Sequence, residues 1–243
     1  MNILSFNVEG ISLSDRFKTF QFSTDYLMKK KKLLHDFILS TGSDIICLQE
    51  FTLNLQFELL GYDTIQINDL AIMFNPKLVE LIDSIYIPKI GLIGNFLHPP
   101  TGFIFFVATA RWTPFKQNVQ QRIESFNTTS DFFTDKTGIF IGDTNARNGD
   151  IESNDILSDA YEGIKEKSGI FTIDKKENPY FPFEPLLYQS RFDRCYMTND
   201  IVCSSMIVCG KEKYDQLKPI SASGCLSDHY ALKVTLNKKK YYD

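Results

Sequence analysis

Acidic and amide side chains stand at the ends of short apolar runs at four places along this chain. They are Asn7 in ILSFNVEG, Glu50 in DIICLQE, Asp143 and Asn145 in GIFIGDTNAR, and Asp228 with His229 in CLSDHYALKV. An uninterrupted apolar run of this length is typical of a buried strand, so the polar residue beside it should emerge where the strand leaves the core. Carboxylates, amides and one histidine at strand ends suit a hard divalent cation and a phosphate ester. These residues therefore predict metal-assisted phosphoester chemistry.

The elements that must position these residues are predicted to be strands with a few helices between them. We expect strands at residues 2–8, 45–48, 62–67, 70–74, 103–108, 138–141, 194–197, 201–208 and 230–236, and helices at residues 28–39 and 118–126. The first helical pattern is amphipathic and is followed by the turn residues Ser-Thr-Gly-Ser. Many strands with few helices favour a mixed α/β sandwich over a doubly wound parallel sheet.

The length and composition predict one packed domain. The chain has 243 residues, of which 43% are hydrophobic and 14% aromatic, which is typical of a globule with a substantial core. The polar motifs extend from residue 7 to residue 229 and leave no room for a second domain. We therefore expect a single catalytic domain over residues 1–237, followed by a short basic tail at residues 238–243.

The net charge of −4 and the sequence pI of about 5.5 argue against a protein that coats DNA nonspecifically. Any nucleic acid should be held locally and over few nucleotides. Most of the 21 Phe residues should fill the core, which leaves one or two for stacking on bases. The lysine run at residues 29–32 is either a solvated helix face or a patch for the DNA backbone.

The cysteine pattern predicts an intracellular protein, either nuclear or cytoplasmic. The five cysteines form no CxxC pair and are odd in number, which fits reduced thiols better than a disulfide framework. Residues 2–8 already have the pattern of a strand, so no signal peptide is expected. No apolar run approaches the roughly 20 residues that a membrane span needs, so no membrane partner is expected.

The order of the polar motifs resembles that of a known superfamily. Asn, Gln-Glu, Gly-Asp-x-Asn, Asp and Ser-Asp-His follow one another as in the endonuclease/exonuclease/phosphatase superfamily, from residue 2 to about residue 236. Residues 142–147 (GDTNAR) and 190–194 (SRFDR) are similar to the GDTNxR and RFDR segments of its 5′-tyrosyl-DNA phosphodiesterase branch. The resemblance implies a DNase I-like fold, an α/β four-layer sandwich in which two mixed β-sheets pack together and are flanked by helices.

The resemblance also implies roles for individual residues. Glu50 would be the principal ligand of Mg²⁺, or of Mn²⁺ as an alternative, with Asn7 and Asp228 near the ion directly or through water. The implied catalytic residues are Asp143, which positions or deprotonates the attacking water, Asn145, which donates to a phosphate oxygen, His229, which stabilises the transition state, and Asp193, which orients His229. The implied substrate-binding residues are Arg111, Trp112, Arg147 and Arg191.

One residue departs from the pattern of this superfamily. Its members usually carry a second histidine in a Thr-x-His segment, and Arg111 stands at that position in ATARW. Arginine can hold a phosphate oxygen but cannot shuttle a proton. Trp112 is placed either at the mouth of the site or in the core, and Arg147 either on a phosphate or in a surface ion pair. The segment 177–187 (ENPYFPFEPLL) is either a self-packed loop or a substrate wall.

The activity implied by the resemblance is hydrolysis of a 5′-phosphotyrosyl linkage to DNA, as in repair of topoisomerase adducts, with tyrosyl-RNA as a further substrate. The partner would be a single-stranded DNA 5′ end carrying a tyrosyl or peptide adduct, and the enzyme would act as a monomer. A general nuclease or phosphatase of the same fold is the alternative enzyme. Arg111 motivates a third reading, a catalytically silent DNase I-like interaction protein.

Overall fold

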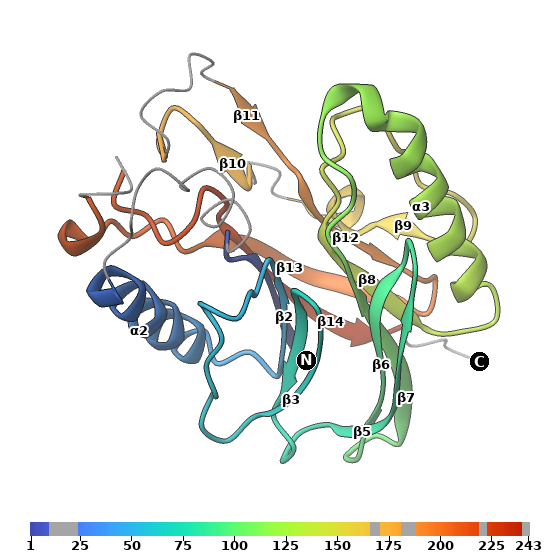
Figure 1. Cartoon of the computed structure of the whole chain (residues 1–243). Coiled ribbons are helices and arrows are strands. Elements are labelled where there is room, and N and C mark those ends of the chain that lie inside the picture. The colour runs from blue at the N-terminus through green and yellow to red at the C-terminus, as the bar shows by residue number, and fades with distance from the viewer. Residues whose placement is uncertain (10–23, 166–170, 181–187, 219–222, 240–243) are drawn as a thin grey trace.

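Two β-sheets face each other and carry a helix on each outer side in the computed structural model, which describes residues 1–9, 24–165, 171–180, 188–218 and 223–239. Helix α2 (Thr24–Ser40) covers one sheet, and helix α3 (Val119–Phe133) covers the other (Figure 1). This arrangement confirms the predicted sandwich of two mixed sheets flanked by helices. No helix among the described residues is both long enough and apolar enough to cross a membrane.

The first sheet contains six strands and both chain directions. In spatial order its strands are β13 (Ile201–Cys209), β14 (Ala231–Lys238), β1 (Asn2–Asn7), β2 (Ile45–Gln49), β4 (Leu70–Phe74) and β3 (Asp63–Ile67). Strands β1 and β2 are parallel, and the other neighbours are antiparallel. The carboxyl ends of β1 and β2 therefore lie beside the amino end of β14.

The second sheet has the same mixed character. In spatial order its strands are β5 (Glu80–Ile87), β6 (Gly91–His98), β7 (Phe103–Thr109), β8 (Gly138–Asp143), β12 (Asp193–Met197) and β9 (Ser158–Asp159). Strands β7 and β8 are parallel, and β12 runs antiparallel to β8. The smaller elements are the sheet of β10 (Ile173–Asp174) and β11 (Gln189–Ser190), and the 3₁₀ turns η1 (Lys116–Asn118), η2 (Ala160–Gly163) and η3 (Asp215–Leu217).

The central strands are apolar on both faces because each face meets a hydrophobic layer. In β2, Ile45 and Cys47 point into the layer between the sheets, whereas Ile46 and Leu48 point toward the layer under α2. Phe140 of β8 likewise packs in the layer under α3. A strand buried on both faces has a continuous apolar sequence, which is why β2 and β8 are easily recognised.

The register of the second sheet sets the positions of two acidic residues. Asp193 pairs with Asp143 across β12 and β8, and Arg111 forms an isolated bridge with Asp143. Gly142 allows this close approach, since a Cβ there would lie 2.4 Å from the carbonyl oxygen of Ala110. The polar ends of strands from both sheets are thereby brought to one edge of the sandwich.

Several parts of the fold differ from the prediction. The hairpin of β5 and β6 was missed, because β5 is largely exposed and β6 contains two glycines. The second helix was predicted to end at residue 126 but continues to Phe133. The predicted strands agree with the observed ranges to within two residues at each end. The two-residue strands β9, β10 and β11 were not predicted, and α2 begins at Thr24 instead of residue 28.

Candidate active site

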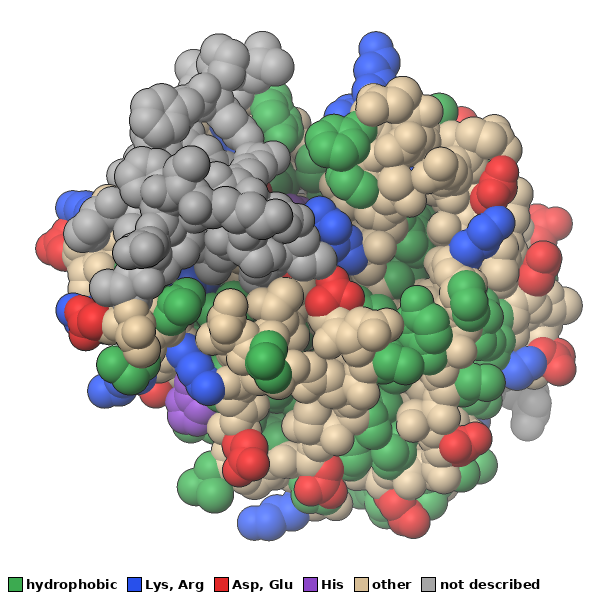
Figure 2. Space-filling view, in the orientation of Figure 1, with side chains coloured by type: hydrophobic (Ala, Val, Ile, Leu, Met, Phe, Trp, Pro, Cys, Tyr) green, Lys and Arg blue, Asp and Glu red, His purple; other side chains and the backbone are tan. Residues whose placement is uncertain are grey.

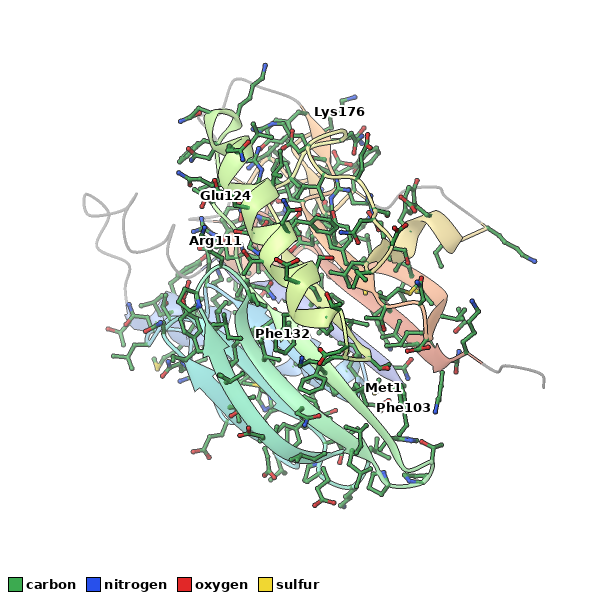
Figure 3. All side chains as sticks on the ribbon, turned by 90° about the vertical axis from the view of Figure 1, so that its right-hand side faces the viewer. Met1, Phe103, Arg111, Glu124, Phe132 and Lys176 are labelled. Carbon is green, nitrogen blue, oxygen red and sulfur yellow. The ribbon has the colours of Figure 1, made fainter. Side chains whose placement is uncertain are left out.

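The predicted polar residues meet in one cavity at the strand ends that lie away from Met1 and Phe103 (Figure 3, in which Arg111 marks this end). The cavity has a volume of about 160 Å³. Seven of the residues predicted from sequence line it: Glu50, Arg111, Asp143, Asn145, Arg147, Asp228 and His229. They come from loops after β2, β7 and β8 and from the loop before β14.

Asn7 connects the carboxylates of Glu50 and Asp143. Its Nδ2 donates to Glu50 Oε1 at 3.1 Å and to Asp143 Oδ2 at 3.0 Å, and the residue is 1% exposed. Its Oδ1 accepts a hydrogen bond from the backbone N–H of Glu9 at 2.9 Å. The amide thus joins the two sheets, and its side-chain oxygen is already engaged by the backbone, so its part in metal binding would be to orient Glu50.

Asp143 is held by amide donors on both oxygens. The backbone N–H of Asn145 donates to Oδ1 at 2.9 Å, and Asn145 Nδ2 donates to Oδ2 at 2.9 Å. Asn145 Nδ2 also donates to the carbonyl oxygen of Trp112 at 3.0 Å. Burial raises the pKa of Asp143 to about 6, although the charges of His229 and Arg111 act to lower it. This carboxylate is therefore close to the protonation range that suits a general base.

His229 lies between two buried carboxylates. Its Nδ1 is 2.8 Å from Asp193 Oδ2, and its Nε2 is 4.0 Å from Asp143 Oδ2. Burial alone would lower the pKa of His229, but Asp193 and Asp143 outweigh that effect and raise it to about 10. The ring is therefore protonated near neutral pH and presents a fixed positive charge. Asp193 is held in turn by Thr172, whose Oγ1 accepts from its backbone N–H at 3.0 Å.

Arg111 forms an ion pair with the carboxylate expected to bind metal. Its Nε lies 2.7 Å from Glu50 Oε1 and 3.8 Å from Asp143 Oδ2. The side chain of Glu50 is 3% exposed, whereas that of Arg111 is 26% exposed and lines the cavity. The guanidinium therefore lies in the cavity beside the carboxylates of Glu50 and Asp143.

Four residues at this edge have left-handed backbones. The φ angles are 58° at Glu9, 56° at Glu50, 74° at Phe115 and 49° at Asn145. Residues other than glycine rarely adopt this region, and backbone strain of this kind concentrates at functional sites. Two of the four, Glu50 and Asn145, carry the polar groups just described. Unfavourable backbone conformations therefore occur at the strand ends where these polar groups lie.

One known protein family matches most of the chain by sequence. The sequence profile of the Endonuclease/Exonuclease/phosphatase family matches residues 4–229.

The chain belongs to this family.

The resemblance inferred from the sequence motifs is thereby confirmed. No curated protein matches the chain by sequence.

Solved structures of the family share the fold over almost the whole chain. The TDP2 protein of D. rerio, complexed with a single-strand DNA product, is 21% identical with a TM-score of 0.82, covering 98% of this chain and 99% of that one. Truncated Caenorhabditis elegans TDP2 is 19% identical with a TM-score of 0.76, covering 98% and 97%. A mannosyl-6-phosphatase of Bacteroides thetaiotaomicron is 19% identical with a TM-score of 0.71, covering 98% and 99%. These likenesses establish the DNase I-like fold.

Family members generally depend on a divalent metal, and the cavity offers two places for one. Ligand atoms of Asp143, Asp193 and His229 lie within 4.8 Å of one another. One of these three ligands is an imidazole nitrogen, a donor type that Mg²⁺ rarely takes, and His229 Nδ1 is already bonded to Asp193. Glu50 and Asp228 instead present carboxylate oxygens to the cavity, which is the donor type that Mg²⁺ prefers. A hard cation therefore fits the side of Glu50, where it would compete with Arg111 for negative charge.

One cation in the cavity was missed by sequence reasoning. Lys175, which follows β10, lines the cavity with a side chain that is 5% exposed, and its Nζ lies 3.9 Å from Asp228 Oδ2. A lone lysine in a polar stretch carries no signal that distinguishes it from a solvated one. Only its position directly after β10, in the connection to β11, shows that it belongs to the site.

A second missed feature lies behind the site. Lys30 is fully buried, and its Nζ donates to Glu9 Oε2 and to the Tyr180 hydroxyl, each at 3.2 Å. The solvated-face reading of the lysine run is therefore wrong for Lys30. The residue shares a helix face with Tyr26 and Leu34, at a spacing of four, and points inward with them. Burial raises the pKa of Glu9 to about 7 although Lys30 opposes this.

Two residues expected to contact substrate lie elsewhere. Trp112 is 3% exposed and stacks on Phe140 with ring centroids 4.7 Å apart, so its ring belongs to the layer under α3. Arg191 pairs with Asp159 through two bonds of 2.9 and 2.6 Å and does not line the cavity. The structure therefore selects the core alternative for Trp112 and corrects the expected substrate contact of Arg191, because aromatic and acidic partners hold these side chains away from the cavity.

Arg147 does line the cavity. Its Nη1 is buried and has no hydrogen-bond partner among the described residues, and its guanidinium lies over the Phe192 ring at 5.8 Å. A buried, unsatisfied guanidinium nitrogen on a residue that lines the cavity favours an anionic ligand over the surface ion pair that was the alternative. The segment 177–187, interpreted as either a self-packed loop or a substrate wall, lies mostly outside the described residues, which include only its first four positions.

Proposed function

We propose that this protein is a Mg²⁺-dependent phosphodiesterase that hydrolyses a 5′-phosphotyrosyl linkage to DNA. The observation that carries the proposal is the pairing of Asp143, whose pKa is raised to about 6, with the protonated imidazole of His229 in one cavity. Such a pair supplies a base for the attacking water and a positive charge for the phosphoryl oxygens.

The chain's own residues divide the remaining work. Asp143 accepts the proton of the water that attacks the phosphorus atom, and Asn145 keeps that carboxylate in place with two hydrogen bonds. Arg147 and Arg111 offer guanidinium donors to the phosphate oxygens. Glu50 and Asp228 would hold Mg²⁺, or Mn²⁺, and the bound ion would neutralise charge that develops on the phosphoryl group.

The positive charges of Arg111, Arg147 and His229 favour a phenolic leaving group. Arg111 and Arg147 contribute two guanidinium cations, and the pKa of His229 is raised to about 10. A site rich in fixed cations stabilises an expelled anion well but transfers protons poorly. The phenolate of tyrosine, with a pKa of about 10, leaves without a proton far more readily than a sugar alkoxide. A site of this kind therefore favours a tyrosyl ester over an internal DNA linkage as its substrate.

The charge on the surface is consistent with a short nucleic-acid ligand. Figure 2 shows acidic and basic side chains interspersed over the described part of this face, without a broad basic stripe. We therefore propose a partner that is held at its 5′ end, a single-stranded DNA end carrying a tyrosyl or peptide adduct.

A phosphatase acting on a sugar phosphate is the second candidate, because the structure is also similar to that of a mannosyl-6-phosphatase. The test is one assay series in which the native protein is given 5′-tyrosyl and 3′-tyrosyl oligonucleotides, an unmodified oligonucleotide and mannose 6-phosphate, with Mg²⁺ and with EDTA. We expect Mg²⁺-dependent release of tyrosine from the 5′ substrate at the highest rate. Faster turnover of mannose 6-phosphate would favour the phosphatase, and no turnover of any substrate would favour a silent interaction protein.

A further inference from the structure

Phe115 is exposed at the mouth of the cavity in a backbone conformation that suits only glycine. Its φ and ψ are 74° and 147°, and its side chain lines the cavity while remaining 59% exposed. This region is essentially reserved for glycine because a Cβ crowds the backbone there. The residue is therefore held in a strained conformation without the compensation of burying its ring.

The strained loop is fixed from below by Arg122 of α3. Arg122 is fully buried, and its Nη1 donates to the carbonyl oxygens of Phe115 at 2.7 Å and Thr113 at 3.2 Å. Asn118 adds two more bonds, from its backbone N–H to the Phe115 carbonyl at 3.2 Å and from Nδ2 to the Pro114 carbonyl at 2.6 Å. The backbone that presents the ring is thus rigid.

The same arginine links this loop to the predicted phosphate contact. Arg122 Nη2 donates to Asp150 Oδ2 at 2.6 Å, and that oxygen also accepts the backbone N–H of Arg147 at 2.9 Å. Phe115 and Arg147 therefore have a common buried support and face the same cavity. No aromatic ring of the described residues stacks on Phe115, so one face of its ring is available to a ligand.

We propose that Phe115 is a specificity-determining residue whose ring stacks on a planar ring of the substrate while Arg147 holds the adjacent phosphate. The inference rests on the proposed function, since a 5′-tyrosyl nucleotide carries a planar ring on either side of its phosphate: the base of the first nucleotide and the tyrosyl phenol. Stacking on an exposed aromatic side chain is tolerant of base sequence, which suits an enzyme that must accept any 5′ end.

Substitution by glycine gives a sharp test, because glycine adopts φ 74° without strain. Phe115→Gly should be at least as stable as the native protein in thermal unfolding, and yet raise KM for a 5′-tyrosyl oligonucleotide about tenfold with little change in kcat. Phe115→Trp should keep the native KM. Lys89→Gly is the matched control, since Lys89 has a φ of 73° but does not line the cavity, and it should leave KM unchanged.

Two further ligands extend the test. The first identifies which ring of the substrate stacks on Phe115. With an abasic first nucleotide, stacking on the base predicts equal KM values for native and Phe115→Gly proteins, whereas stacking on the phenol predicts the same loss as before. Binding of a 5′-phosphorylated single strand, measured by fluorescence anisotropy, separates the inference from the proposed activity. Weaker binding by Phe115→Gly in a protein without tyrosyl activity would overturn the activity alone. Active enzyme with unchanged KM and unchanged binding in Phe115→Gly would overturn the stacking role.

Discussion

Removing the charge of Asp193 should change how His229 titrates. In the native protein the carboxylate lies 2.8 Å from Nδ1 of the ring and is fully buried. We expect Asp193→Asn to let burial, which acts to lower the pKa of His229, prevail over the remaining carboxylate. The imidazole would then be neutral over much of the working pH range and would no longer carry the positive charge that the mechanism needs.

The size of the effect follows from the raised pKa. A change from 6.5 in the unfolded chain to about 10 in the folded protein corresponds to up to about 5 kcal/mol of preferential stabilisation of the imidazolium. Because the folded pKa is the higher one, this contribution to stability is fully present below pH 6.5 and is lost as the pH rises through about 10. The native free energy of unfolding should therefore decline over that window, and the decline should be much smaller in Asp193→Asn.

The chain is well suited to a direct measurement, since it contains only three histidines. Ring signals in ¹H–¹⁵N correlation spectra can be assigned with His35→Gln and His98→Gln, two positions outside the cavity. We expect the His229 signal to stay protonated to about pH 9 in the native protein and to titrate near neutrality in Asp193→Asn. At pH 8, kcat should fall by about 10²–10⁴-fold in the variant.

The exposed carboxylate of Asp83 provides the control, because Asp83→Asn removes a charge of the same kind outside the cavity and should change neither the titration nor kcat. A native His229 that titrates below pH 7 would refute the reasoning, since the two carboxylates would then fail to outweigh burial. Unchanged kcat in Asp193→Asn at pH 8 would refute the catalytic use of the imidazolium.

Six further substitutions test the site and its support. Glu50→Gln and Asp143→Asn should each reduce kcat by about 10²–10⁴-fold with an unchanged circular dichroism spectrum, and only Glu50→Gln should abolish Mg²⁺ binding in calorimetry; near-native kcat would contradict either role. Arg111→Ala should lower kcat/KM. Arg111→His should retain activity that declines as the pH rises over roughly 6–8, because imidazole loses its proton there. A fully active Arg111→Ala variant would show that Arg111 does not contact the phosphate. Lys30→Met should lower the free energy of urea unfolding by about 3–5 kcal/mol because Glu9 is left buried without its cation, and Glu9→Gln in the same chain should recover much of that loss.

Much of the site could be predicted because local pattern and residue chemistry coincide there. Strands such as β2 and β8 are apolar on both faces, so the polar residue that follows each strand marks the edge of the core. Glu50 and Asp143 were located in this way, and the motif order carried the resemblance to the family. The exposed strand β5 lacks such a pattern, which is why its hairpin with β6 was missed.

The sequence by itself therefore determined the sandwich of two mixed sheets and the ends of the strands at which the polar groups stand, because burial on both faces leaves a local apolar signature. Only the tertiary structure decided which side chains enter the cavity. Trp112 and Arg191 turn to partners far along the chain, while Lys175 and Phe115 are brought in by loops without a local pattern. The raised pKa values of Asp143 and His229 likewise arise from burial and from charges contributed by distant strands, which no local pattern contains.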